Sequence, residues 1–162
     1  EMIEKDLNFN SDSHEVKKLE IDKLKQIIFK DGLPYQLVGN VGIGKTLTIK
    51  KLIKEDKEHI YIVFDCHNEY DLPQIQTITT DLKESCRIKM PEQISAAKGL
   101  FPVYFNQLLS QKFPDNYVVV IEEAHRYRET KTLLKEARKF VKVIAILQEP
   151  IANFCPIVRI VD

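Results

Sequence analysis

The sequence predicts an α/β fold, in which a mainly parallel sheet is covered by helices on both faces. Several short segments are rich in β-branched residues and almost continuously apolar, which is typical of strands buried on both sides. Segments in which apolar residues recur with helical spacing fall between most of these strands. The expected strands span residues 35–38, 60–64, 117–121, 142–147 and 157–161, with a possible short strand at 87–89, and the expected helices span 45–55, 92–111 (with a break near 99–102) and 130–140.

The length and composition indicate one domain over residues 1–162. We expect a polar N-terminus and a leading helix in residues 1–31, followed by the core in residues 35–162. The apolar fraction of 44% and the charged fraction of 30% are those of an ordinary globular protein. Lys and Arg number 24, as do Asp and Glu, so no overall field draws the chain to nucleic acid or to an anionic membrane. Any basic surface for DNA must therefore be local or be built by assembly.

The leading helix is predicted from a stripe of apolar residues that runs from Val16 to Ile28. Asp12 and Glu15 have the spacing of a capping box at its start, and a glycine at Gly32 ends it. We interpret this helix as a packing element and keep a partner-binding arm as the alternative.

The three cysteines, Cys66, Cys86 and Cys155, are far apart and form no C-x-x-C pair. This spacing favours a reducing compartment and argues against a disulfide framework or a zinc site. No apolar run approaches the ~20 residues that a membrane-spanning helix needs, and no signal peptide follows Met2. We therefore expect a cytoplasmic protein with no membrane partner.

Residues 39–46 read G-N-V-G-I-G-K-T, which is the pattern of a phosphate-binding loop. An expected strand precedes the loop and an expected helix follows it, so backbone N–H groups and the helix dipole both point at a bound phosphate. Lys45 is expected to reach the β- and γ-phosphates of ATP, and the Thr46 hydroxyl to bind Mg²⁺. An ordinary glycine-rich turn is the alternative. The expected nucleotide-binding residues are Gly39, Asn40, Val41, Gly42, Ile43, Gly44, Lys45, Thr46 and Leu47.

Two acidic residues, Glu122 and Glu123, follow directly after the expected strand 117–121. Ligands of open α/β sheets lie outside the carboxyl ends of the strands, so this pair is expected beside the phosphate-binding loop. A carboxylate that follows a buried strand is costly to desolvate unless it meets a cation. We interpret Glu122 as the Mg²⁺ carboxylate, acting through water, and Glu123 as the base that polarises the attacking water. The alternative is an exposed acidic turn.

Four segments together resemble the HerA/FtsK-type P-loop ATPases. Residues 121–127, I-E-E-A-H-R-Y, are similar to the I-D-E-A-H-R-F segment of that family, and residues 63–70, V-F-D-C-H-N-E-Y, to its D-P-H-G-E-Y segment. Residues 135–140, K-E-A-R-K-F, resemble R-E-G-R-K-F, and residues 145–150, A-I-L-Q-E-P, resemble a segment that ends in T-Q-R-P. The chain departs from the pattern at Glu122, where the family usually has Asp, and at Glu149, where it usually has Arg.

The resemblance implies a minimal, RecA-like P-loop ATPase core that uses ATP and Mg²⁺. Members of this family are largely hexameric motors that move DNA, so it also implies a homo-oligomeric ring and sequence-nonspecific DNA as a partner. Gln148 corresponds to a polar sensor of the γ-phosphate or the attacking water, with a solvated strand-end Gln as the alternative. Arg138 corresponds to a phosphate-contacting arginine, acting within its subunit or across an interface, with a surface arginine as the alternative. Arg126, Arg128 and Arg159 are further candidates for this role, and each is better interpreted as structural than as catalytic.

A second class of function stays open, in which the chain is a nucleotide-dependent switch that acts on a protein partner. Its neutral charge and its altered Gln148-Glu149 pair favour this reading. A small-molecule kinase is disfavoured because adjacent glutamates suit the activation of water. No N-K-x-D motif supports guanine specificity.

A metal site built from Cys66, His67 and His125 lacks the spacing of metal ligands. Asp65 and Glu69 are expected either at the rim of the nucleotide site or in a solvated loop.

Overall fold

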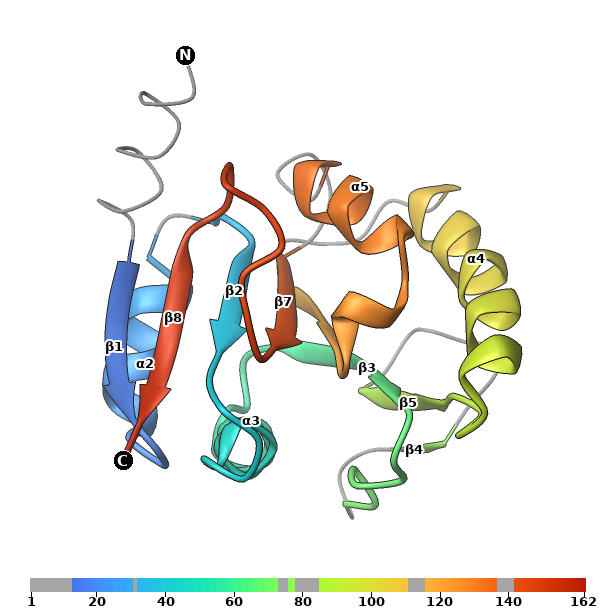
Figure 1. Ribbon diagram of the computed structural model, residues 1–162. Coiled ribbons are helices and arrows are strands. Elements are labelled where there is room, and N and C mark those ends of the chain that lie inside the picture. The colour runs from blue at the N-terminus through green and yellow to red at the C-terminus, as the bar shows by residue number, and fades with distance from the viewer. Residues whose placement is uncertain (1–12, 31, 73–75, 78–84, 111–115, 137–141) are drawn as a thin grey trace.

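The strands of the protein lie side by side in one parallel sheet (Figure 1). The computed structural model describes residues 13–30, 32–72, 76–77, 85–110, 116–136 and 142–162. In this part of the chain the sheet has eight strands in the order β1-β8-β2-β7-β6-β3-β5-β4, and every neighbouring pair is parallel. The strands are β1 (Ser13–Lys17), β2 (Tyr35–Val38), β3 (Ile60–Asp65), β4 (Gln76–Thr77), β5 (Cys86–Lys89), β6 (Tyr117–Ile121), β7 (Lys142–Leu147) and β8 (Ile157–Val161).

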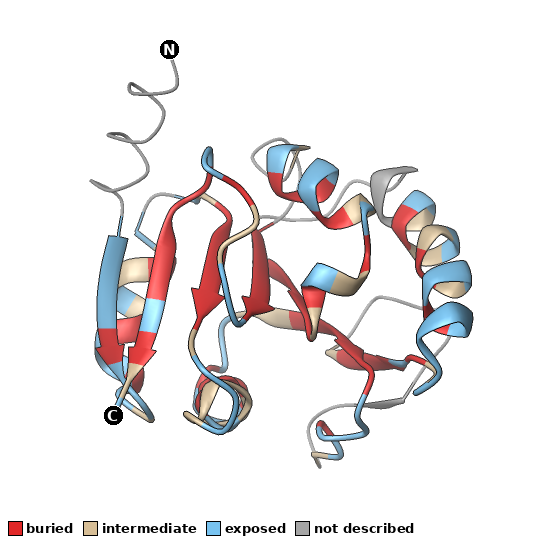
Figure 2. Cartoon of the chain, in the orientation of Figure 1, coloured by how far each residue is buried: buried red, intermediate tan, exposed pale blue. Residues whose placement is uncertain are grey.

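Helices cover both faces of the sheet, as the sequence predicts. The helices are α2 (Ile21–Ile28), α3 (Lys45–Glu55), α4 (Ile94–Ser110) and α5 (Glu129–Glu136), with a short 3₁₀ turn, η1 (Ala124–Arg126). Successive side chains of a strand point to opposite faces. In β3, Tyr61 and Val63 pack in the core with α2 and α3, whereas Ile62 and Phe64 pack in the core with α4 and α5. The central strands are accordingly buried along their length (Figure 2), which explains their nearly continuous apolar sequences.

The leading segment differs from the predicted helix. Residues Ser13–Lys17 form the edge strand β1, in which Val16 is fully buried opposite Ile160 of β8. Leu19 adopts a left-handed backbone with φ of +64°, and the helix begins only at Ile21. The predicted capping box is therefore wrong, because Glu15 lies within β1; Asp12 lies outside the described residues. The apolar residues at the start of this segment are compatible with either a helix or a strand. Residues Ser13–Lys17 form a strand because they pair with β8.

Helix α4 continues without the predicted break. Pro102 lies inside it and lacks the N–H that an inner helical residue would donate. Phe101 is fully buried, and its ring stacks on Tyr127 with centroids 4.2 Å apart. Phe101 also packs against Phe64 of β3. Phe105, one turn further along, is buried in the same core, so the helix packs against the sheet on both sides of the proline.

A buried amide anchors the connection from β7 to β8, which crosses the sheet as a loop rather than as a helix (Figure 1). Gln36 of β2 is fully buried, and its Nε2 donates to the carbonyl oxygens of Ala152 and Cys155, both at 2.9 Å. Its Oε1 accepts from the backbone N–H groups of Ile151 at 2.8 Å and Ala152 at 3.1 Å. One side chain thus satisfies four backbone groups of the loop that follows Gln148.

We expect Gln36→Leu to lower the free energy of unfolding by at least ~2 kcal/mol, because it leaves buried backbone donors and acceptors without partners. Chemical denaturation measures the change. The exposed Gln26 of α2 provides the matched control, since Gln26→Leu should change stability by less than ~0.5 kcal/mol. Equal stability of the two variants would mean that other contacts hold the loop.

Candidate active site

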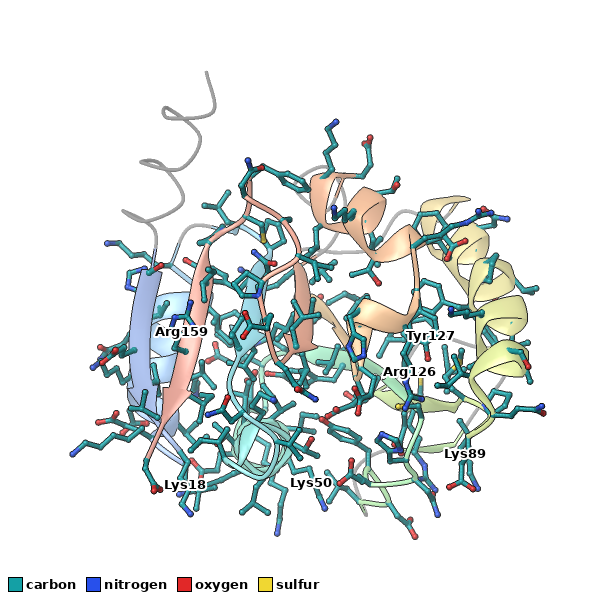
Figure 3. The ribbon with its side chains drawn as sticks, viewed as in Figure 1. Lys18, Lys50, Lys89, Arg126, Tyr127 and Arg159 are labelled. Carbon is teal, nitrogen blue, oxygen red and sulfur yellow. The ribbon has the colours of Figure 1, made fainter. Side chains whose placement is uncertain are left out.

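The phosphate-binding loop joins the end of β2 to the start of α3. Gly42 and Gly44 have φ values of +82° and +108°, a region that side chains with a Cβ rarely adopt. The side chain of Lys18 packs directly against Gly44, and Lys18 lies at the edge of the molecule where α3 begins (Figure 3). The Nζ of Lys45 donates to the carbonyl oxygen of Gly39, inside the curve of the loop. The glycines therefore shape a loop whose backbone and lysine face one region.

A carboxylate from β6 meets this loop. Glu122 follows β6 directly and is 4% exposed. The Thr46 hydroxyl donates to Glu122 Oε2 at 2.8 Å, and the Tyr70 hydroxyl donates to the same oxygen at 2.5 Å. Three segments that are distant in the sequence thus converge on one carboxylate oxygen at the carboxyl edge of the sheet.

The neighbouring carboxylate has a different environment. Glu123 has a left-handed backbone with φ of +51°, and its side chain lies beside two histidines. His67 Nε2 lies 3.0 Å from Glu123 Oε2, and His125 Nδ1 lies 3.7 Å from Oε1. Glu123 is half-buried, so more of it is exposed than of the buried Glu122.

These environments shift the two carboxylates in opposite directions. Burial raises the pKa of Glu122, although the hydrogen bonds from Tyr70 and Thr46 oppose this. Burial also acts to raise the pKa of Glu123, but the hydrogen bond with His67 and the charges of Arg126 and His125 outweigh it and lower the pKa. Paired carboxyl groups with diverging pKa values are typical of sites that assign them different roles. Glu123 stays ionised, as a base requires, whereas Glu122 gains most from a cation.

Burial disfavours the charged form of Lys45 and so lowers the pKa of its ammonium group, while the charges of Glu122 and Glu123 act to raise that pKa. The lysine is thus partly desolvated and lies within electrostatic reach of two carboxylates.

A cavity of about 430 Å³ brings these groups together. Its volume falls in the usual range for small-molecule sites, ~300–1,000 Å³. Gln148, directly after β7, lies in its wall, as does Glu69. The lining residues are Val41, Gly42, Gly44, Lys45, Thr46, Leu47, Lys50, His67, Glu69, Glu122, Glu123, Ile146, Leu147 and Gln148.

Several arginines and one acidic residue that the sequence singles out are not placed in the cavity wall. Arg138 falls outside the described residues. Arg128 is exposed beside Glu129, and Arg159 is exposed on β8 (Figure 3). Asp65 is not at the rim, since it is 1% exposed and forms an ion pair with Arg87 at 3.0 Å.

The donor set of the site fits Mg²⁺ that is shared with a nucleotide. Thr46 and Glu122 offer a hydroxyl and a carboxylate oxygen, which are ligands that this hard cation accepts, and phosphate oxygens usually complete its coordination. Within the described residues no three His, Cys, Asp or Glu side chains are grouped to hold a metal by themselves. Burial raises the pKa of Cys66 to about 12, so this thiol is not poised as a thiolate ligand.

The sequence did not predict the contacts that two residues make with the glutamate carboxylates. Tyr70 binds Glu122, and His67 binds Glu123, both from the loop after β3. The position of this loop at the carboxyl end of a strand next to β6 was the available signal. The way the loop turns determines which of its side chains reach the carboxylates, and the sequence pattern does not predict this turn.

A parallel sheet with a phosphate-binding loop after one strand and paired carboxylates after another defines the RecA-like class of P-loop NTPases. The sequence matches the AAA domain family over residues 31–155, and the chain belongs to this family of nucleotide-dependent P-loop proteins. No curated protein and no solved structure gives a significant match. Within the described residues no helix has both the length and the apolar character to cross a membrane.

We expect His67→Ala to raise the pKa of Glu123, because the hydrogen bond stabilises the ionised carboxylate. Carboxyl-carbon NMR of labelled glutamate measures the titration, and the midpoint in the parent should lie below that of an exposed glutamate. Phe29→Leu, which alters a ring that stacks on His59 and does not line the cavity, should leave the midpoint unchanged. An unaltered midpoint in His67→Ala would contradict the assigned contact.

Proposed function

We propose that the protein is an ATPase that hydrolyses ATP with Mg²⁺. The observation that carries this proposal is the 2.8 Å contact between Thr46 of the phosphate-binding loop and Glu122 after β6, in the wall of the cavity that also includes Glu123. A P-loop positions phosphates, but hydrolysis also needs a carboxylate for the metal and a group that orients water.

Each residue has a defined task in this proposal. The backbone N–H groups of the loop and the Lys45 ammonium bind the phosphates, and Thr46 and Glu122 hold the metal. Bound there, Mg²⁺ supplies charge that stabilises the phosphoryl group during transfer. Glu123 accepts a proton from the attacking water, since its lowered pKa keeps it ionised at neutral pH. Gln148 donates from its amide to the water or to the γ-phosphate.

We expect Glu123→Gln to bind ATP normally and to hydrolyse it more slowly by ~10²-fold or more, because the amide keeps the shape and loses the base. Glu122→Gln should instead weaken binding that depends on Mg²⁺. Lys45→Ala should lose most nucleotide binding and still fold. A phosphate-release assay and titration with a fluorescent ATP analogue measure the two properties. Full turnover by Glu123→Gln together with none by Glu122→Gln would reverse the two roles.

We further propose that hydrolysis drives a DNA motor of the HerA/FtsK type, acting in the cytoplasm as a homo-oligomeric ring. The four motif resemblances support this. Hydrolysis also needs cations around the cavity that stabilise the phosphoryl group. Among the described lining residues these cations are Lys45 and Lys50, with no arginine. An arginine finger would then come from outside this set, from Arg126, whose charge acts on Glu123, from Arg138 or from a neighbouring subunit.

The alternative proposal is a nucleotide-dependent switch that acts on a protein partner. The balance of 24 basic and 24 acidic residues favours it, because a neutral subunit has no general attraction for phosphate backbones. A ring of neutral subunits could still bind DNA if Lys and Arg side chains from all subunits lined its central channel.

The two proposals differ in how the ATPase rate responds to DNA. The motor predicts stimulation by duplexes of unrelated sequence, a steep fall of DNA affinity with salt, and loss of stimulation at concentrations where the ring dissociates. Steady-state hydrolysis with and without DNA, alongside mass measurement with a bound ATP analogue, tests this. A rate that DNA and salt leave unchanged while rings are present would favour the switch.

A further inference from the structure

Tyr70 forms a contact with the candidate metal carboxylate for which the phosphate-binding chemistry gives no reason. Its side chain is completely buried, and its hydroxyl donates to Glu122 Oε2 at 2.5 Å. A tyrosine hydroxyl that is removed from water needs a partner, and here the partner is an acidic side chain that is itself 4% exposed. The contact therefore determines where the Glu122 carboxylate lies.

A glutamate needs such a constraint more than a shorter acid does. Its three side-chain torsions allow the carboxylate many positions, and ordering them costs conformational entropy. Tyr70 and Thr46 donate to the same oxygen of Glu122 from two sides. The hydroxyl of Tyr70 carries no positive charge, so it orients the carboxylate and leaves its negative charge for a cation.

The loop that carries Tyr70 is itself held rigidly. Asp65 Oδ1 accepts the backbone N–H of Glu69 at 3.0 Å, and its Oδ2 accepts that of Tyr70 at 2.9 Å. Arg87 of β5 donates to Asp65 Oδ2 at 3.0 Å and to the side chain of Asn68 at 2.6 Å. The loop is thus wound around a buried carboxylate and fixed from the neighbouring strand.

We propose that Tyr70 is a positioning residue for the metal ligand. It holds the carboxylate of Glu122 beside the Thr46 hydroxyl, so that a divalent cation arriving with a nucleotide meets both oxygens at once. This proposal rests on the proposed Mg²⁺-dependent nucleotide site. Outer partners of metal ligands typically contribute ~10–100-fold to metal affinity, because they orient the ligand before the metal binds.

Tyr70→Phe tests the proposal, since it removes one oxygen atom and keeps the ring. Binding of a fluorescent ATP analogue is titrated against Mg²⁺ and is measured again in EDTA. We expect the Mg²⁺ concentration at half-maximal effect to rise by ~10-fold or more, while affinity in EDTA changes by less than about twofold, because the loop and Lys45 are untouched.

Tyr61→Phe is the matched control. Tyr61 is equally buried in the same segment of chain, and its hydroxyl also donates to a carboxylate at 2.5 Å, that of Asp56, which does not line the cavity. This variant should lose stability and keep the Mg²⁺ requirement of the parent. Equal requirements in Tyr70→Phe and the parent would overturn the proposal, as would equal shifts in both tyrosine variants.

Two further outcomes separate the possible failures. A parent protein that binds no nucleotide with or without Mg²⁺ would overturn the proposed function and this inference with it. If Tyr70→Phe does not fold, Arg87→Lys replaces it, because a lysine keeps the charge but its ammonium ends one bond short of the Nη1 atom that donates to both Asp65 and Asn68. That variant must also raise the Mg²⁺ requirement, and an unchanged requirement would overturn the proposal.

Discussion

The hydrogen bond between Thr46 and Glu122 is the contact on which the arrangement of the site depends. It joins the phosphate-binding loop after β2 to the end of β6, and β7 lies between these two strands in the sheet. The contact can form only because parallel strands end at a common edge. Gln148 follows the intervening β7 and consequently lies in the wall of the same cavity. Strand order therefore determines which side chains share the site.

Electrostatics then distinguish the two glutamates that β6 presents. Glu122 is buried with neutral hydroxyl donors, and its raised pKa means that a cation would stabilise its ionised form. Glu123, whose own backbone is left-handed, contacts His67, and its lowered pKa keeps it ionised. Adjacent positions in the sequence thus acquire different properties because their side chains meet different partners, hydroxyl groups at Glu122 and a histidine at Glu123. This difference supports the assignment of one to the metal and the other to water.

Much of the fold and part of the site could be predicted from the sequence. The phosphate-binding loop is a contiguous motif, and Glu122 and Gln148 follow strands whose apolar runs are easy to recognise. The edge strand β1 was missed because Val16 pairs with Ile160, near the other end of the chain, and such pairing leaves no local signal. Tyr70 was missed because its position depends on a turn around Asp65 that Arg87 fixes from another strand.

A crystal structure with Mg²⁺ and a non-hydrolysable ATP analogue tests the central claim most directly, namely that the loop and β6 form one metal-dependent nucleotide site. We expect phosphates along the loop beside Lys45, and a metal next to the Thr46 hydroxyl on the side of Glu122, with Tyr70 still bound to that carboxylate. A nucleotide bound outside this cavity, or a metal held away from both Thr46 and Glu122, would contradict this claim.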